Sequence, residues 1–209
     1  MLKWCRDHKR HLIVGGKDQL PDGNFYNTAY VVSPDGEIVF KQAKKQPIQF
    51  FKDGKPAPSQ QVWHSPWGPI GIAICYDFSY TRVIDELVKQ GAQALIIPTM
   101  DVIEWGRAQH ETHARLGPIR AAEYGVPVVR VCSSGVSQIV SASGQVEQTL
   151  PFDGHGAMFA STLTLENSGH TPWDRWLVRG CLAAVAVLFA VGAWRRIGPS
   201  PLIPTGGSR

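Results

Sequence analysis

Residues 68–91 read GPIGIAICYDFSYTRVIDELVKQG, a strand pattern that leads directly into a helix pattern. The run Pro69–Cys75 is apolar on both faces, which is typical of a central, buried strand. After Thr81, the apolar residues recur with the spacing of one helix face, at Val83, Ile84, Leu87 and Val88. Gly91 is a typical helix stop. The stretch predicts an α/β or α+β fold built on a mixed sheet.

The flanking sequence extends this pattern in both directions. Before it, strands are expected at 11–16, 25–33, 37–41 and 62–65, with Pro-Asp-Gly turns at 21–23 and 34–36 and a loop at 44–61. After it, we expect a strand at 94–98 and a helix at 108–124 that Gly117-Pro118 disturbs. Four more strands are expected, at 126–132, 137–141, 146–150 and 157–165.

Composition excludes several classes of protein. Hydrophobic residues make up 44% and charged residues 18% of the 209 residues, which favours a packed core over disorder. The net charge of +4 is too small to indicate a nucleic-acid partner. The four cysteines form no CxxC pair, which argues against a zinc ribbon and a disulfide scaffold.

The C-terminal part has a different character. Gly180–Trp194 is 15 residues long without a charge, and Arg195-Arg196 follows it. Counted from Trp176, with Arg179 reaching the interface, the helix would span about 28 Å, close to the thickness of a bilayer core. We therefore expect one domain at 1–167, a juxtamembrane linker at 168–179, a transmembrane helix at 176–196 and a disordered tail at 197–209. A buried core helix is the alternative.

Cys75 is the main candidate for a reactive residue. It ends the buried strand, and such a strand-to-helix elbow presents one side chain together with backbone N–H groups. A thiolate in that position is a strong nucleophile. A cysteine on an apolar strand is also commonly a small core residue, so position alone leaves both interpretations open.

Several motifs resemble a known family. Gly71-Ile-Ala-Ile-Cys75-Tyr-Asp77 is similar to the nucleophile motif of the nitrilase superfamily of carbon–nitrogen hydrolases. Further matches, in the family's order, are Tyr26–Ala29 with Pro34–Gly36, Ala108–Val126 with its Arg120–Glu123 element, Ser134–Ser137 and Ser143-Gly144. The resemblance covers about residues 11–165 and implies a partial nitrilase-like αββα sandwich. Together with the C-terminal apolar helix, it points to the apolipoprotein N-acyltransferase branch.

The resemblance also implies a site. In the family, a Glu-Lys-Cys triad acts on an acyl group, so Cys75 would be the nucleophile and the N–H of Tyr76 an oxyanion donor. Lys44, eight residues past Gly36, is the best match for the lysine, with Lys41 and Lys45 as competitors. No cofactor and no metal are implied.

Other residues have weaker claims. Asp101, Glu104 and Trp105 follow the strand after Cys75 and are either pocket residues or ordinary loop residues. His110 and His113 are three positions apart, and we expect hydrogen-bonded histidines there rather than metal ligands or a dyad partner of Cys75.

The sequence departs from the family at two points. The family's base glutamate lies several dozen residues before the lysine, but no glutamate precedes Glu37 here. An accessory glutamate is not visible in the loop Pro47–Gly54. The chain is therefore interpreted as the C-terminal part of a longer protein and is expected to lack the base.

The implied function is N-acylation of a lipoprotein's N-terminal cysteine from a phospholipid donor, through a thioester on Cys75. The implied partners are that phospholipid, the apolipoprotein acceptor and the membrane. The implied location is the bacterial inner membrane, with the catalytic domain on the periplasmic side and the C-terminus in the cytoplasm. A membrane-anchored amidase and a non-catalytic pseudo-enzyme module are the alternatives.

Overall fold

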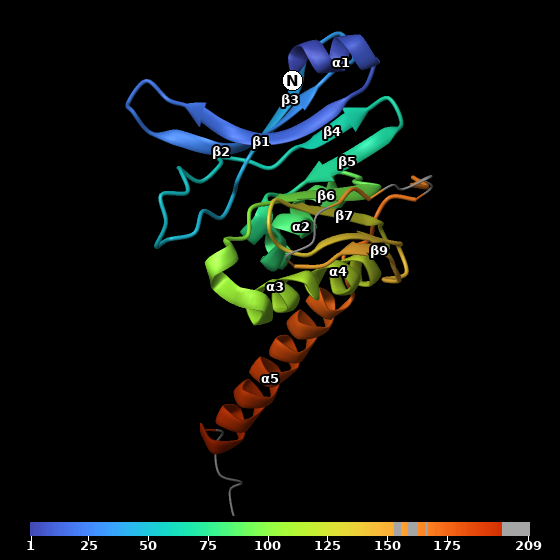
Figure 1. The fold of residues 1–209 in the computed structure, drawn as a ribbon. Coiled ribbons are helices and arrows are strands. Elements are labelled where there is room, and N and C mark those ends of the chain that lie inside the picture. The colour runs from blue at the N-terminus through green and yellow to red at the C-terminus, as the bar shows by residue number, and fades with distance from the viewer. Residues whose placement is uncertain (153–155, 159–162, 166, 198–209) are drawn as a thin grey trace, which may run out of the picture. The chain divides into compact units, whose positions relative to one another are not determined.

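A computed structural model describes residues 1–152, 156–158, 163–165 and 167–197. The chain divides into two compact units, residues 1–171 and 172–209. The first holds two β-sheets and most of the helices, and the second holds one long helix (Figure 1).

The first sheet has three antiparallel strands in the order β1 (Leu12–Gln19), β2 (Phe25–Val32) and β3 (Ile38–Ala43). The predicted Pro-Asp-Gly turns join them, and Gly23 and Gly36 have φ of 79° and 76°. Glycine adopts this left-handed backbone without steric cost, which explains its place at the end of each turn.

The second sheet has six strands arranged in chain order. They are β4 (Val62–Ser65), β5 (Gly68–Ile72), β6 (Ala94–Thr99), β7 (Val128–Cys132), β8 (Ser137–Val140) and β9 (Val146–Leu150). The central strands β5, β6 and β7 are parallel, and the outer pairings are antiparallel. The mixed sheet predicted from the sequence is confirmed.

The helices of the first unit are short. They are α1 (Leu2–His8), η1 (Cys75–Ser79), α2 (Thr81–Lys89), η2 (Ile103–Trp105), α3 (Gly106–Ala114) and α4 (Leu116–Tyr124). The single helix expected at 108–124 is two helices that meet at Arg115. Pro118 lies in the first turn of α4, where its missing N–H leaves no helical hydrogen bond unmade.

Two apolar clusters give the unit its layers. Between the sheets, Ala29 and Val31 of β2 pack with Ile70 and Ile72 of β5. On the other side of the second sheet, its buried residues pack against α2 and α4, for example Leu95 in one cluster with Leu87. Sheet, sheet and helices therefore stack in the nitrilase-like arrangement that the sequence predicted.

The long helix α5 (Asp174–Ile197) contains the expected transmembrane segment 176–196 and begins inside the stretch expected to be a linker. Its 24 residues span about 36 Å, and it is long and apolar enough to cross a membrane.

Two expected segments fall wholly or partly on residues that the structure does not describe. For the strand expected at 157–165, residues 159–162 lie outside the described residues, and the described ones beside them are not in a strand. For the expected disordered tail, 198–209 lie outside the described residues.

Candidate active site

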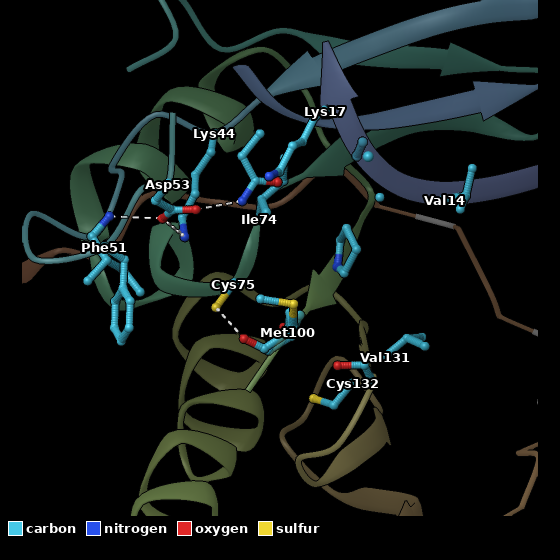
Figure 2. A pocket seen from close by; sticks show the side chains of 18 of the residues that line it. Val14, Lys17, Lys44, Phe51, Asp53, Ile74, Cys75, Met100, Val131 and Cys132 are labelled. Carbon is cyan, nitrogen blue, oxygen red and sulfur yellow. Dashed lines mark hydrogen bonds and ion pairs between the residues drawn. The ribbon is translucent and has the colours of Figure 1, made fainter. Parts of the chain in front are cut away.

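Cys75 is the first residue of η1 and follows the end of β5 at Ile72 by three positions, so it does not end the strand as expected. Its φ of 50° is left-handed, which is uncommon for a residue with a side chain and marks a position that its surroundings hold in place. The residue is 5% exposed, and its Sγ lies 3.8 Å from the carbonyl oxygen of Met100 at the end of β6 (Figure 2). The predicted elbow is therefore present, with the sulfur at its apex.

Asp77 holds this elbow against the segment that follows β3. Its buried carboxylate accepts backbone N–H groups from Lys45, Gln46 and Ile74 at 3.1, 2.6 and 3.2 Å. Burial raises the pKa of Asp77 to about 6, although the three N–H groups and the charge of Lys44 oppose that rise. The Asp77 carboxylate thus links the backbone just before Cys75 to the backbone that follows Lys44.

Lys44 is the buried lysine of the site, at 1% exposure. Its Nζ lies 2.6 Å from Oδ2 of Asp53, whose Oδ1 accepts a hydrogen bond of 2.7 Å from the Asn27 side chain. The backbone N–H of Ile48 also donates to Asp53, at 2.9 Å. Asp53 therefore holds the ammonium and closes the loop, and the sequence analysis did not predict this role for an aspartate.

The two competing lysines point to other partners. Lys41 pairs with Asp18 at 2.9 Å on the exposed side of the first sheet, and Lys45 donates to the carbonyl oxygen of Pro58 at 2.8 Å. Of these three lysines, only Lys44 lines the same cavity as Cys75.

Cys75 and Lys44 influence each other electrostatically. Burial raises the pKa of the Cys75 thiol, and the positive charge of Lys44 partly offsets this by lowering it. The resting sulfur is therefore a thiol at neutral pH, and the ammonium favours any negative charge that develops near it.

Tyr76 follows the nucleophile candidate directly. Among the described residues, no acceptor is recorded for its backbone N–H, because the amide belongs to the unpaired first turn of η1. Such an N–H is available to an oxyanion.

A cavity of about 950 Å³ opens between the sheets at this point. Cys75, Lys44 and Asp53 line it together with a largely apolar wall, which includes Ile13, Val14, Phe25, Ala29, Ile48, Phe51, Ile74, Ile96, Pro98, Met100, Val102 and Val131. Its volume lies at the upper end of the range for small-ligand pockets. The cavity brings the two predicted catalytic residues into one space.

The three candidate pocket residues lie in different places. Trp105 lines the cavity, whereas Asp101 and Glu104 are not among its lining residues. Asp101 is buried at 1% exposure, and Glu104 is exposed.

Asp101 belongs to a buried ionic cluster. Its carboxylate lies 2.7 Å from Nη2 of Arg130 and 3.0 Å from Nδ1 of His113, and Nδ1 of His110 is 3.7 Å away. Burial alone would raise the pKa of Asp101, but the His113 hydrogen bond and the Arg130 charge outweigh it and lower the pKa to about 2.

The expectation of two hydrogen-bonded histidines is right for His113, which bonds to Asp101, and wrong for His110, whose two buried ring nitrogens have no hydrogen-bond partner within the described part of the chain. The guanidinium of Arg130 fills the space beside Asp101 and disfavours a bound cation. Among the described residues, no group of three side chains is arranged to hold a metal.

Two curated proteins show what this chain is similar to in sequence. An apolipoprotein N-acyltransferase of Allorhizobium ampelinum is 28% identical over 83% of this chain and 38% of its own length. An omega-amidase of Xenopus laevis is 30% identical over 42% of this chain and 36% of its own length. The chain thus spans about two fifths of the length of these relatives.

A solved structure and a family model also match this chain. Nit3 of Saccharomyces cerevisiae, a member of branch 10 of the nitrilase superfamily, matches with a TM-score of 0.66 at 20% identity, over 74% of this chain and 60% of that one. The model of the carbon-nitrogen hydrolase family matches residues 1–165. This match takes in both sheets, the Cys75 elbow and Lys44, and the chain belongs to the carbon-nitrogen hydrolase family.

Proposed function

We propose that Cys75 is the nucleophile of an acyl-transfer site and that Lys44 and the N–H of Tyr76 stabilise the oxyanion. The observation that carries this proposal is the placement of a strained, buried cysteine and a buried lysine in the wall of one large cavity. A nucleophile on a sharp turn beside unpaired N–H groups suits attack on an acyl carbonyl.

The substrate proposed for the first step is a phospholipid, in line with the acyltransferase relative and the apolar cavity wall. The Cys75 sulfur forms a bond to the ester carbonyl carbon, and the carbon–oxygen bond to the glycerol breaks. The thiol proton ends on the departing glycerol oxygen, so a lysophospholipid leaves and a thioester remains on Cys75.

The proposed second step transfers the acyl group to an amine. The α-amine of a lipoprotein's N-terminal cysteine attacks the thioester, the carbon–sulfur bond breaks, and the amine proton returns to the sulfur. The resemblance assigns the proton transfers to a glutamate that has no counterpart before Lys44 in this sequence, where Glu37 is the first glutamate. The Lys44 ammonium favours the negative oxygen in both steps.

The membrane supplies the setting of this proposal. Helix α5 is long enough to cross a bilayer, and both proposed substrates carry lipid. We place the protein in the bacterial inner membrane with residues 1–171 on the periplasmic side and the C-terminus in the cytoplasm, where Arg195 and Arg196 follow the positive-inside rule.

The first experiment asks whether Cys75 carries an acyl group. The full chain in detergent is incubated with phospholipid, and peptide mass spectrometry measures thioester at each cysteine. We expect acylation at Cys75, its loss in Cys75→Ala, and no loss in Cys181→Ala, where the cysteine lies on the exposed surface of α5. Absence of acyl-Cys75 under conditions where the folded chain binds lipid would contradict the proposal and favour the pseudo-enzyme alternative.

Hydrolysis is the second candidate function, since the omega-amidase relative suggests amide substrates. Water would then release the thioester in place of an amine. Parallel assays of lipopeptide acylation and of ammonia release from small amides separate the two functions. Ammonia release without lipopeptide acylation would favour the amidase.

A further inference from the structure

The charges that line the cavity are unbalanced. Its ionisable basic and acidic side chains are three lysines, Lys17, Lys44 and Lys52, and one carboxylate, Asp53. Asp53 is already paired with Lys44 at 2.6 Å, so the two remaining lysines leave the cavity with an excess of two positive charges. A cavity with apolar walls and such an excess favours a ligand that is apolar at one end and anionic at the other.

Lys17 belongs to the wall that the first sheet provides. It is on β1, directly opposite Asn27 of β2, and Asn27 holds the carboxylate that pairs with Lys44. Its Nζ lies 4.7 Å from the centre of the Phe25 ring, another residue of the wall. Among the described residues, no carboxylate forms an ion pair with Lys17, so its charge is open to a ligand.

Lys52 approaches from the loop after β3, between Phe51 and Asp53 of the same wall. It is exposed, and within the described part of the chain it has no ion-pair partner. The neighbouring Phe51 ring packs 5.8 Å from Trp105, so an apolar surface continues beside the charge (Figure 2 shows Lys17, Phe51 and Asp53).

We infer that Lys17 and Lys52 bind the phosphate-bearing head of the acyl donor and select a head with a net negative charge over a zwitterionic one. This inference rests on the proposed function, because it places the fatty chain along the apolar wall beside Cys75. A zwitterionic head brings its own cation toward the two lysines, whereas a phosphoglycerol head brings none.

The test uses two ether lipids that cannot be cleaved, so that binding is read without acyl transfer. They share one dialkyl body with a photoreactive diazirine and differ only in a phosphoglycerol or a phosphocholine head. Each is crosslinked to the full chain in neutral detergent at low salt. Peptide mass spectrometry then measures the label on the cavity peptides, which come from β1 and residues 98–105. The label on peptides from α5 serves as the internal reference.

We expect the phosphoglycerol probe to label the cavity peptides about fivefold more than the phosphocholine probe, as a charge contact in partial water would give. The α5 peptides should take up both probes equally. In Lys17→Met with Lys52→Met the cavity ratio should fall to about one, and high salt should reduce it in the unmodified chain.

Lys89→Met is the matched control, because Lys89 ends α2 and does not line the cavity. An unchanged ratio in the double variant, equal labelling by both probes, or a cavity that neither probe labels would each overturn the inference. Repeating the crosslinking in Cys75→Ala keeps the result independent of the proposed chemistry. If the cavity prefers the phosphoglycerol probe but the acylation experiment finds no acyl group on Cys75, the head-group preference stands and the proposed acyl transfer is wrong.

Discussion

Lys44 combines almost complete burial with a single carboxylate partner. An ammonium in such a place is costly without compensation, and Asp53 supplies it while remaining on the cavity wall. The same ammonium lowers the pKa of the Cys75 thiol against the effect of burial. The reactivity of the Cys75 sulfur therefore depends on the charge of Lys44. Lys44 follows β3 of the first sheet, whereas Cys75 follows β5 of the second.

Replacement of Lys44 should make Cys75 less reactive. In Lys44→Met the thiol pKa rises further, because burial then acts without an opposing charge. We expect thioester formation to fall by about a hundredfold or more, as for loss of one oxyanion donor. The pH dependence of Cys75 alkylation and the single-turnover acylation rate measure the two effects.

Lys45→Met is the control, since Lys45 donates to Pro58 and not to the site. Lys44→Arg keeps the charge, so it should keep the thiol pKa lower than Lys44→Met does. Equal alkylation profiles in all three variants would contradict the electrostatic role of Lys44.

Asp101 should stabilise the folded chain because it balances the charge of the buried Arg130. In Asp101→Asn the guanidinium stays buried without its counter-charge, a change that typically costs about 3–5 kcal/mol. Because the pKa of Asp101 is lowered to about 2 in the folded chain, its stabilising effect is present above pH 4 and is lost as the pH falls toward 2. Chemical denaturation between pH 2 and 7 should show a weaker acid dependence in the variant than in the parent chain.

Strand β5 is closely packed at Gly71. A Cβ added at Gly71 would lie 2.9 Å from a Leu95 methyl group and 3.3 Å from the Cβ atoms of Ala92 and Leu87. These neighbours belong to β6, to the turn after α2 and to α2 itself. Glycine at this position lets α2 lie directly on the strand that precedes Cys75.

The expected result for Gly71→Ala is a loss of about 1–3 kcal/mol in the free energy of unfolding, from overpacking. Displacement of β5 would also move the elbow, so acylation of Cys75 should fall. Gly15→Ala is the matched control, because no heavy atom lies within 4 Å of a Cβ added there. Equal unfolding free energies for the two variants would show that β5 has room to adjust.

Local patterns predicted most strands and the α2 helix well. The apolar run before Cys75 and the helical spacing after Thr81 report burial of neighbouring residues, which is local information. The break at Arg115 was placed two residues too late, because Pro118 signals a boundary but is tolerated in the first turn of a helix. Helix α1 has seven residues and no apolar periodicity to reveal it.

The site was only partly predictable for a different reason. Cys75 and Lys44 are linked to recognisable motifs, but Asp53 and Asp77 act through contacts that the fold brings together. Asp77 accepts N–H groups from residues 31 and 32 positions away, and no spacing rule in the sequence indicates such a bond. Arg130 reaches Asp101 across 29 positions in the same way.

At the scale of the whole molecule, α5 is long and apolar enough to cross a membrane, and the proposed location depends on it. Its side chains are exposed from Trp176 to Arg196, and its length suits a bilayer. Two arginines at its centre, in Val185→Arg with Leu188→Arg, should each cost about 2.5–3.5 kcal/mol of insertion free energy. We expect the variant to leave the membrane fraction on alkaline extraction.

Trp173→Arg with Trp194→Arg is the control, because both positions lie at the ends of the helix, where arginine is better tolerated. Retention of the central variant in the membrane would contradict a transmembrane role for α5.

The buried setting of the Cys75 sulfur has a consequence for its chemical durability. Peroxide oxidises the thiolate form of cysteine, and oxidation beyond sulfenic acid is irreversible for most proteins. Because burial raises the pKa of this thiol and its Sγ faces the carbonyl oxygen of Met100, little thiolate is present between reactions. The burial that keeps the proposed nucleophile in its thiol form should therefore also slow its oxidation.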